Sequence, residues 1–209
     1  MRFLVAASRR NVLAGGIVLA TLQAGVPARQ AQASGPNGLA AGGLAAGGLA
    51  EGAPRPLPEF GFTDAEGRPH GLADFAGQGL VINLWATWCP PCVAEMPALD
   101  RVQAALAEQG VVVLALSSDR GGKAQVAAFY RDRGIRRLGL WLDPRGAAAR
   151  ALGARGLPTT VIIDRQGLER ARLEGAAEWD TPEMLAAVRR LTSPVAAPTV
   201  SVPAGQSRS

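Results

Sequence analysis

Short runs of apolar residues recur along the chain, and each has the length of a single strand. The longest, Leu80-Val-Ile-Asn-Leu-Trp85, is apolar at every position but one. A continuous apolar run of this length is typical of a strand that is covered on both faces. Together with the shorter runs, it predicts strands at residues 80–85, 111–116, 138–142, 159–164 and 168–173.

The segments between the strands show helical spacing instead. After Cys89, apolar residues recur every three or four positions until Gly110 ends the pattern. Strands that alternate with helices indicate an α/β fold with a mostly parallel central sheet. Further helices are predicted at residues 123–133, at residues 146–152 and from Thr181 onward.

The first 33 residues have the layout of an export signal. A basic stretch ends at Arg10, an apolar run follows over residues 12–26, and Ala31 and Ala33 offer a cleavage site after Ala33. Ser8 and the two arginines after it resemble the twin-arginine export motif, although an ordinary signal is an alternative. Both routes place the mature chain outside the cytoplasm. An uncleaved membrane anchor is a third option, with an apolar run that is short for a span.

Residues 34–55 contain a five-residue repeat of glycine, leucine and alanine. Glycine at this density opposes both helix and strand, so we expect a flexible linker. Residues 193–209 have no periodicity and are expected to be disordered. The folded domain is therefore expected at residues 56–192, and it should begin with a β-hairpin formed by residues 59–62 and 68–72.

The formal net charge of +5 overstates the charge of the folded domain. Residues 1–33 carry four arginines and no acidic residue, which leaves +1 for the remainder, five less four. No basic cluster with interleaved aromatic residues is present, so we do not expect nucleic-acid binding.

Both cysteines of the chain lie in Trp-Ala-Thr-Trp-Cys-Pro-Pro-Cys, residues 85–92. A structural disulfide here would close a loop of only four residues, and the entropic gain falls with loop size. A zinc site needs four ligands, of which this pair supplies two. A copper site would need only the two sulfurs and an imidazole, and His70 is the one histidine. The other interpretation of His70 is a partly exposed residue at a sheet edge.

Redox chemistry is the third interpretation of the pair. The two sulfurs lie where a buried strand meets a helix, and a helix N-terminus stabilises a thiolate because its N–H groups and dipole are positive. Pro90 and Pro91 suit the first helical turn, where no N–H is needed. Cys89 is then expected to be the exposed nucleophile, and Cys92 the more buried thiol that resolves a mixed disulfide.

With these features the chain resembles the thioredoxin superfamily, and within it the TlpA/ResA-like exported thiol–disulfide oxidoreductases. Residues 83–99 and Gly156-Leu-Pro-Thr-Thr-Val-Ile-Ile-Asp164 carry the resemblance, which covers about residues 57–192. It implies a thioredoxin-like α/β fold, with a central mixed β-sheet flanked by helices and an N-terminal β-hairpin extension. Asn83 departs from cytoplasmic thioredoxins, which carry a buried aspartate there.

The resemblance also implies roles for individual residues. Glu95, one helical turn after Cys92, would be a buried acid of raised pKa that moves protons to and from the thiol, whereas a solvated glutamate is the alternative. Pro158 would be a cis proline that faces the sulfurs, and Trp85 would belong to the core or shield the disulfide. The expected catalytic residues are Cys89, Cys92 and Glu95, and the expected substrate-binding residues are Trp88, Pro90, Pro91, Leu157, Pro158 and Thr159.

The function implied is that of a periplasmic reductase of disulfides in client proteins, for example apocytochrome c or copper-site assembly proteins. A membrane thiol donor would re-reduce it, it would act as a monomer, and it would need no metal or cofactor beyond the Cys89–Cys92 disulfide. The intervening prolines do not decide the direction, so a dithiol oxidant stays open. A copper-handling protein that uses both sulfurs as ligands is the alternative from another class. A peroxidase is disfavoured because neither cysteine is preceded by the P-x-x-x-T/S arrangement that peroxide reduction uses in that family.

Overall fold

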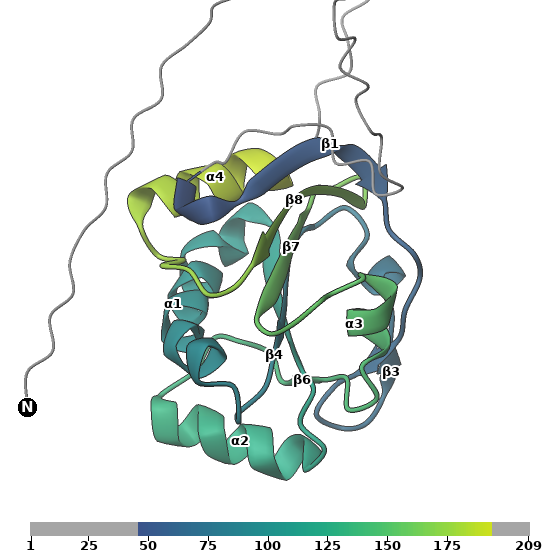
Figure 1. Ribbon diagram of the computed structural model, residues 1–209, viewed down its shortest axis with the longest axis vertical. Coiled ribbons are helices and arrows are strands. Elements are labelled where there is room, and N and C mark those ends of the chain that lie inside the picture. The colour runs from purple at the N-terminus through teal and green to yellow at the C-terminus, as the bar shows by residue number, and fades with distance from the viewer. Residues whose placement is uncertain (1–45, 194–209) are drawn as a thin grey trace, which may run out of the picture. The chain divides into compact units, whose positions relative to one another are not determined.

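The computed structural model describes residues 46–193, which form one mixed β-sheet with helices on both faces (Figure 1). The predicted signal, most of the predicted linker and residues 194–209 lie outside the described part. Among the described residues, no helix is both long enough and apolar enough to cross a membrane. The strands are β1 (Ala50–Pro56), β2 (Phe62–Thr63), β3 (Pro69–His70), β4 (Gly79–Trp85), β5 (Val111–Ser117), β6 (Trp141–Leu142), β7 (Thr159–Ile163) and β8 (Leu168–Glu174).

The helices follow the predicted order, with boundaries shifted by a few residues at most. Short 3₁₀ turns precede β1, link β3 to β4 and extend the first helix. The α-helices are α1 (Pro90–Leu106), α2 (Gly122–Arg133), α3 (Ala147–Ala151) and α4 (Pro182–Thr192), and the 3₁₀ turns are η1 (Ala46–Gly48), η2 (Leu72–Phe75) and η3 (Ala107–Gln109).

The sheet has the strand order β1-β8-β7-β4-β5-β6-β2-β3. Only β4 with β5 and β5 with β6 are parallel, and the other described pairings are antiparallel. The expectation of a mostly parallel sheet from strand–helix alternation is therefore wrong, whereas the mixed sheet implied by the resemblance is confirmed. The reason is that β8 follows β7 through a tight turn at residues 164–167, without a helix, and such a connection can only join antiparallel strands.

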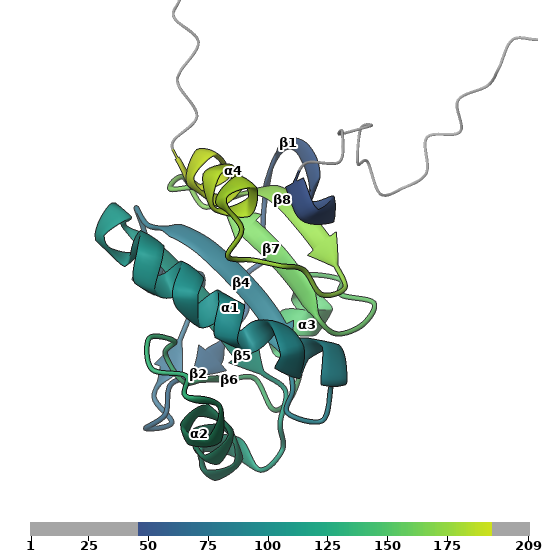
Figure 2. The same cartoon turned by 90° about the vertical axis from the view of Figure 1, so that its left-hand side faces the viewer.

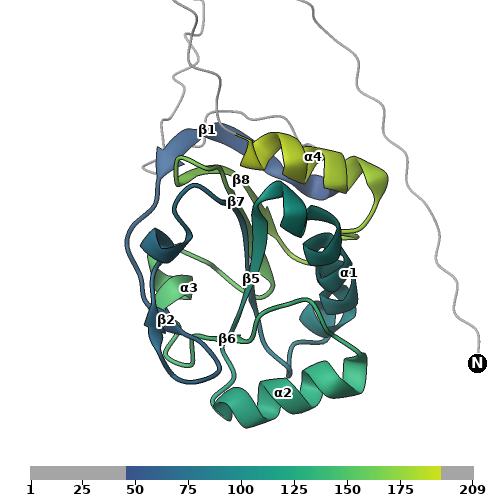
Figure 3. The same cartoon turned by 180° about the vertical axis from the view of Figure 1, so that it is seen from behind.

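The two faces of the sheet are covered by different helices. Along β4, Leu80, Ile82 and Leu84 face one apolar layer, whereas Val81 and Trp85 face the other. This alternation is the two-residue period of a strand. Helices α1 and α4 cover the Val81 face, and α3 covers the Leu80 face (Figures 1 and 3). Figure 2 shows α1 lying across the sheet over β4 and β5.

The predicted linker is too long at its C-terminal end. Residues 50–56 form edge strand β1 on β8, and Leu49, from the last copy of the glycine repeat, is fully buried in the core. Ion pairs from Glu51 to Arg190 and from Arg55 to Glu169 fix the strand in place. Glycine and proline content predicted no strand here, but pairing with β8 and burial of one leucine outweigh that local preference.

Four loops lie together along the side of the sheet where β4, β5 and β6 end, and this side is called the carboxyl edge of the sheet. Strands β4, β5 and β6 are parallel, so the loops that follow them leave from the same edge. Strand β7 is antiparallel to β4, with Thr159 opposite Leu84, so the loop that precedes β7 reaches the same edge. In open α/β sheets, sites form outside the carboxyl ends of the strands. Both cysteines and the Gly156-Leu-Pro158 segment are therefore brought to one edge.

Candidate redox site

The cysteines form a disulfide at the start of α1. Cys89 is the N-cap of the helix, the S–S distance is 2.10 Å and the two Cα atoms lie 5.3 Å apart. Pro90 and Pro91 occupy the first helical positions, where a missing N–H costs nothing. The same two prolines leave the Cys92 amide as the first helical N–H group, and it donates to Cys89 Sγ at 3.3 Å. In the reduced protein this donor and the helix dipole both favour a thiolate on Cys89.

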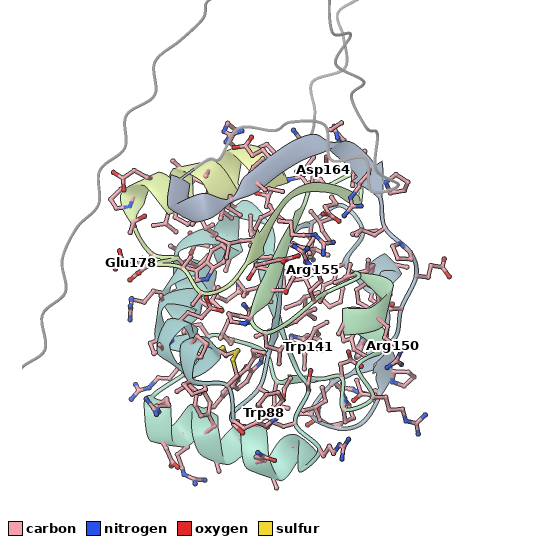
Figure 4. The ribbon with its side chains drawn as sticks, viewed as in Figure 1. Trp88, Trp141, Arg150, Arg155, Asp164 and Glu178 are labelled. Carbon is pink, nitrogen blue, oxygen red and sulfur yellow. A yellow bond between two sulfur atoms is a disulfide. The ribbon has the colours of Figure 1, made fainter. Side chains whose placement is uncertain are left out.

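The two sulfurs differ in access to solvent. Cys92 is fully buried, and the Cys89 residue is 5% exposed. Pro90 and Pro91 are exposed, and Trp88 is 67% exposed, the one large apolar side chain among residues 46–193 to be so exposed. Figure 4 shows Trp88 beside the disulfide at the start of α1. The expectation that Cys89 is exposed is therefore wrong for the disulfide form, in which both cysteines are buried because they pack into the core at the start of α1. Cys89 is the less buried of the two, and it lies next to the exposed residues Trp88 and Pro90.

The loop before β7 holds three of the expected substrate-binding residues, Leu157, Pro158 and Thr159, and its Leu157–Pro158 peptide bond is cis. Leu157 is half-buried, and neither its N–H nor its C=O has a hydrogen-bond partner among the described residues. Pro158 already accepts from the amide of Gly175, at 2.9 Å. Thr159 is fully buried between β4 and β8, and its hydroxyl donates to the Gly156 carbonyl. Of these residues, Leu157 is the one whose backbone is free to pair with another chain.

Glu95 lies one turn after Cys92 and is buried, with only 3% of the residue exposed. Its carboxylate accepts three N–H groups and forms no ion pair within the described part of the chain. Asn83 Nδ2 donates to Oε1 at 2.8 Å, while Trp179 Nε1 at 2.8 Å and the Ala177 amide at 3.1 Å donate to Oε2. Burial raises the pKa of Glu95 above its usual value, and the three hydrogen bonds offset only part of that rise. The expected buried acid of raised pKa is thus what the structure shows.

Asn83 connects this acid to the sheet. It lies on the α1 face of β4 and also donates to Thr160 Oγ1 at 3.0 Å. Its own carbonyl oxygen, Oδ1, is buried without a partner in the described structure. The Asn83 side chain therefore binds Glu95 through its N–H₂ group, and its oxygen Oδ1 could still accept a hydrogen bond.

Sequence reasoning did not find Trp179, Ala177 or Thr160. Trp179 is fully buried and lies 84 positions after Glu95, in the loop that leads to α4. An isolated tryptophan in a polar segment gave no signal for this contact. Trp85 belongs to the core, as one of the two predicted alternatives had it, and packs against Phe129 and Tyr130.

A second buried acid, Asp119, holds the loop before Cys89. It accepts from the Thr87 amide and hydroxyl at 2.9 and 2.7 Å, from Ser117 Oγ at 2.8 Å and from Gln125 Nε2 at 2.9 Å. These bonds tie the ends of β4 and β5 to α2. No pattern in the sequence marked Asp119 as different from the other acidic residues.

His70 is not at the disulfide. It lies on β3 at the end of the sheet, four strand positions from β4, or roughly 19 Å at about 4.8 Å per strand. Its ring contacts Asp74 Oδ2 at 3.0 Å and Asp64 Oδ2 at 3.4 Å, and it packs against Phe62 and Trp141. The structure therefore does not bring together the ligand set of the copper hypothesis. Among the described residues, no group of three or more His, Cys, Asp or Glu side chains is placed to hold a metal ion.

Comparison with known proteins agrees with this geometry. The model of the AhpC/TSA family matches residues 54–171, more than half of the chain. The chain belongs to the AhpC/TSA family. This family lies within the thioredoxin superfamily, which confirms the resemblance drawn from the cysteine motif.

Among curated relatives, the chain is 36% identical over 110 residues to the thiol-disulfide oxidoreductase ResA of Geobacillus thermodenitrificans. The match covers 53% of this chain and 62% of that protein, which is less than two thirds of its length. Relatives of the same name from Bacillus thuringiensis and Halalkalibacterium halodurans are 36% and 32% identical.

Solved structures show the same fold. The exposed lipoprotein thioredoxin Etrx1 of Streptococcus pneumoniae superposes with a TM-score of 0.54 at 25% identity, covering 64% of this chain and 99% of that one. A secreted thiol-disulfide isomerase from Corynebacterium glutamicum has the same TM-score and identity, covering 64% and 85%. The thioredoxin-like α/β fold is confirmed.

Proposed function

We propose that this protein is a thiol–disulfide oxidoreductase that reduces disulfides in client proteins outside the cytoplasm. The observation that carries the proposal is a disulfide at a helix N-terminus together with a buried carboxylate, Glu95, that lies one helical turn after Cys92 and has no cation partner among residues 46–193. The names of the ResA relatives support the same activity.

The reaction begins at Cys89. Its thiolate, stabilised by the Cys92 amide, attacks one sulfur of the client disulfide and forms a mixed disulfide, while the other client sulfur leaves as a thiolate. Trp88 and the unpaired backbone of Leu157 offer the client an apolar rim and a place to pair as a short strand. Pro90 and Pro91 complete the rim beside the sulfur.

Resolution of the mixed disulfide falls to Cys92. This thiol is fully buried, so its proton cannot pass directly to water. Glu95 takes the proton, and the Cys92 thiolate then attacks Cys89, releasing the second client thiolate and leaving the Cys89–Cys92 disulfide. The client gains two electrons and the protein loses two. A raised pKa suits Glu95 to this exchange because it brings the carboxyl closer to the pKa of a thiol.

The wider setting is part of the same proposal. The export signal expected in residues 1–33 and the structurally similar exposed and secreted proteins support action outside the cytoplasm, and the proposed compartment is the periplasm. The clients are proteins of the cytochrome c maturation or copper-site assembly type, a membrane thiol donor restores the dithiol, and the protein acts as a monomer. No metal or cofactor beyond the disulfide takes part.

The test is capture of a client by a single cysteine. Cys92→Ser should form a stable mixed disulfide through Cys89 with an oxidised Cys-x-x-Cys-His peptide, visible as a mass increase that dithiothreitol reverses. Cys89→Ser should capture none, because the remaining sulfur is buried. Capture by Cys89→Ser alone would contradict the assigned roles.

A further inference from the structure

A groove lies beside the disulfide on the same edge of the sheet. It has a volume of about 530 Å³ and is lined by Trp88, by residues 118–120 and Gln125, and by residues 144–146. These are the loops that follow the three parallel strands β4, β5 and β6, together with the first turns of α2. The groove therefore begins at the residue that precedes Cys89, at the exposed indole labelled in Figure 4.

The acidic groups near this groove are engaged inside the protein. Asp119 is 1% exposed, and its carboxylate accepts four hydrogen bonds from Thr87, Ser117 and Gln125. Asp143 is 3% exposed and accepts from the amides of residues 147 and 148 at the start of α3. Both carboxylates are held by hydrogen bonds from within the protein, so neither forms an ion pair with a guanidinium on the rim.

The basic side chains of the groove, unlike the acidic ones, are exposed and unpaired in the described part of the chain. Arg120 and Arg145 are exposed, and neither guanidinium has a hydrogen-bond or ion-pair partner within residues 46–193. The other basic residues nearby are engaged, since Lys123 pairs with Glu66 at 3.3 Å and Arg150 donates to the Arg145 carbonyl. The groove thus presents two unpaired guanidinium groups and an exposed indole next to the reactive sulfur.

We infer that this groove binds an extended client segment that carries aspartate or glutamate within a few residues of the cysteine under attack. The inference rests on the proposed function and adds a preference among clients. A guanidinium binds a carboxylate through paired N–H donors, and the exposed indole provides an apolar surface for the intervening chain. Two exposed guanidinium groups without an ion-pair partner among the described residues also attract a negatively charged segment to the rim of the groove.

The experiment uses the full chain carrying Cys92→Ser, so that only the attack by Cys89 is measured. The probes are three seven-residue peptides with a central cysteine linked to thionitrobenzoate, flanked by two glutamates, two glutamines or two lysines. Attack joins Cys89 to the peptide sulfur and releases the coloured thionitrobenzoate anion, so no other oxidant or reductant is needed. The rate constants are compared with and without Arg120→Gln and Arg145→Gln together.

The glutamate peptide should react about tenfold faster than the lysine peptide, and the double variant should remove most of this ratio. Added salt should reduce the ratio as well. Arg136→Gln with Arg137→Gln is the matched control, since it removes two exposed arginines outside the groove, and it should keep the ratio.

The inference would be overturned if the double variant and the control variant had the same ratio of glutamate-peptide to lysine-peptide rate constants. This holds even if all three peptides react. The glutamine peptide tests the proposed function separately, because its reaction needs Cys89 but not the arginines. A protein that reacts with none of the peptides would contradict both the proposed function and the groove.

Discussion

Glu95 and Asp64 are both buried acids, but Glu95 lies over the interior strand β4, whereas Asp64 lies at the β2–β3 end of the sheet, and their surroundings differ. Asp64 lies in the turn between β2 and β3 and is 6% exposed. Burial tends to raise its pKa, but hydrogen bonds from the amide and guanidinium of Arg68, from His70 and from the Glu66 amide outweigh burial and hold the pKa well below its usual value. Glu95 receives only neutral N–H donors, and its pKa is raised.

The comparison sharpens the roles proposed for the two acids, Asp64 in stability and Glu95 in proton transfer. A carboxylate that faces cations is ionised at every working pH, so it acts as a fixed anchor for the hairpin. A carboxylate held by neutral donors in a dry site can exchange a proton with a neighbouring thiol. Variants at Glu95 and at Asp64 should therefore separate into effects on rate and effects on stability.

The largest effect is expected for Cys89→Ala. Turnover of a client disulfide should fall by about a thousandfold or more, to the uncatalysed rate, because no other sulfur can reach the client. The free energy of unfolding should change little, since the lost bridge closes only a four-residue loop. Single-turnover kinetics and urea denaturation check the two statements, and residual turnover above background would contradict the first.

Glu95→Gln comes next. The resolving step should slow by about a hundredfold at pH 7, because Cys92 loses its proton acceptor. The fold should accept the change, since Asn83 can turn its unpaired Oδ1 toward the new amide. Stopped-flow kinetics of mixed-disulfide release from pH 5 to 9 measure the step. An unchanged rate and pH profile would remove Glu95 from the mechanism.

The same variant should change how stability depends on pH. The folded pKa of Glu95 lies above its value of about 4.5 in the unfolded chain, so the folded state binds the proton more tightly. Relative to Glu95→Gln, the native protein should therefore lose stability as the pH rises from 4.5 through the raised pKa. Urea midpoints across that range measure the difference.

Trp179→Phe is expected to have an intermediate effect. It keeps the aromatic bulk but removes one N–H donor from Glu95 Oε2. The free energy of unfolding should fall by about 1–2 kcal/mol at neutral pH, and the pKa of Glu95 should rise further. The pH profile of the resolving step should therefore shift upward by a measurable amount. A loss of stability with no shift of the profile would limit Trp179 to packing.

Asp64→Asn should act on stability alone. The folded pKa of Asp64 is below its usual value of 3.8, so its contribution is present above pH 3.8 and is lost as the pH falls below it. The urea midpoint of the variant should be lower than that of the native protein at pH 7, and the gap should close toward pH 2. The rate of disulfide exchange should stay within about twofold. A variant with normal stability at pH 7 would contradict the assigned anchor.

The smallest effect on rate is expected for His70→Ala. Exchange should be unchanged within experimental error, because His70 lies on β3, four strand positions from the strand β4 that leads to the disulfide, and packs with the hairpin aromatics. A loss of function with both thiols intact would favour the copper hypothesis instead.

The parts of the fold with regular spacing were predictable. The helix after Cys89 was predicted from apolar residues at three- and four-residue intervals, and Met96, Leu99, Val102 and Leu106 are all fully buried. The buried strands were equally predictable, because a short continuous apolar run bounded by turn residues is typical of a strand covered on both faces. Both signals come from local periodicity.

The missed parts depend on distant pairing. Strand β1 forms because β8 offers an unpaired edge, which a glycine-rich segment does not reveal. Trp179 reaches Glu95 only because the chain returns over α1 after β8. The cysteine motif pointed to the two sulfurs and the acid one turn away, but the N–H donors that hold that acid come from β4 and from the loop before α4.

The reduction potential of the Cys89–Cys92 pair tests the central claim most directly. The protein would be equilibrated with dithiothreitol and glutathione buffers, and the tryptophan fluorescence would report the oxidised fraction. A value near or below about −250 mV, at the thioredoxin end of the scale, is the result expected for a reductase. A value near about −120 mV would make the protein an oxidant and reverse the proposed direction, and a pair that forms no disulfide at all would contradict the redox function itself.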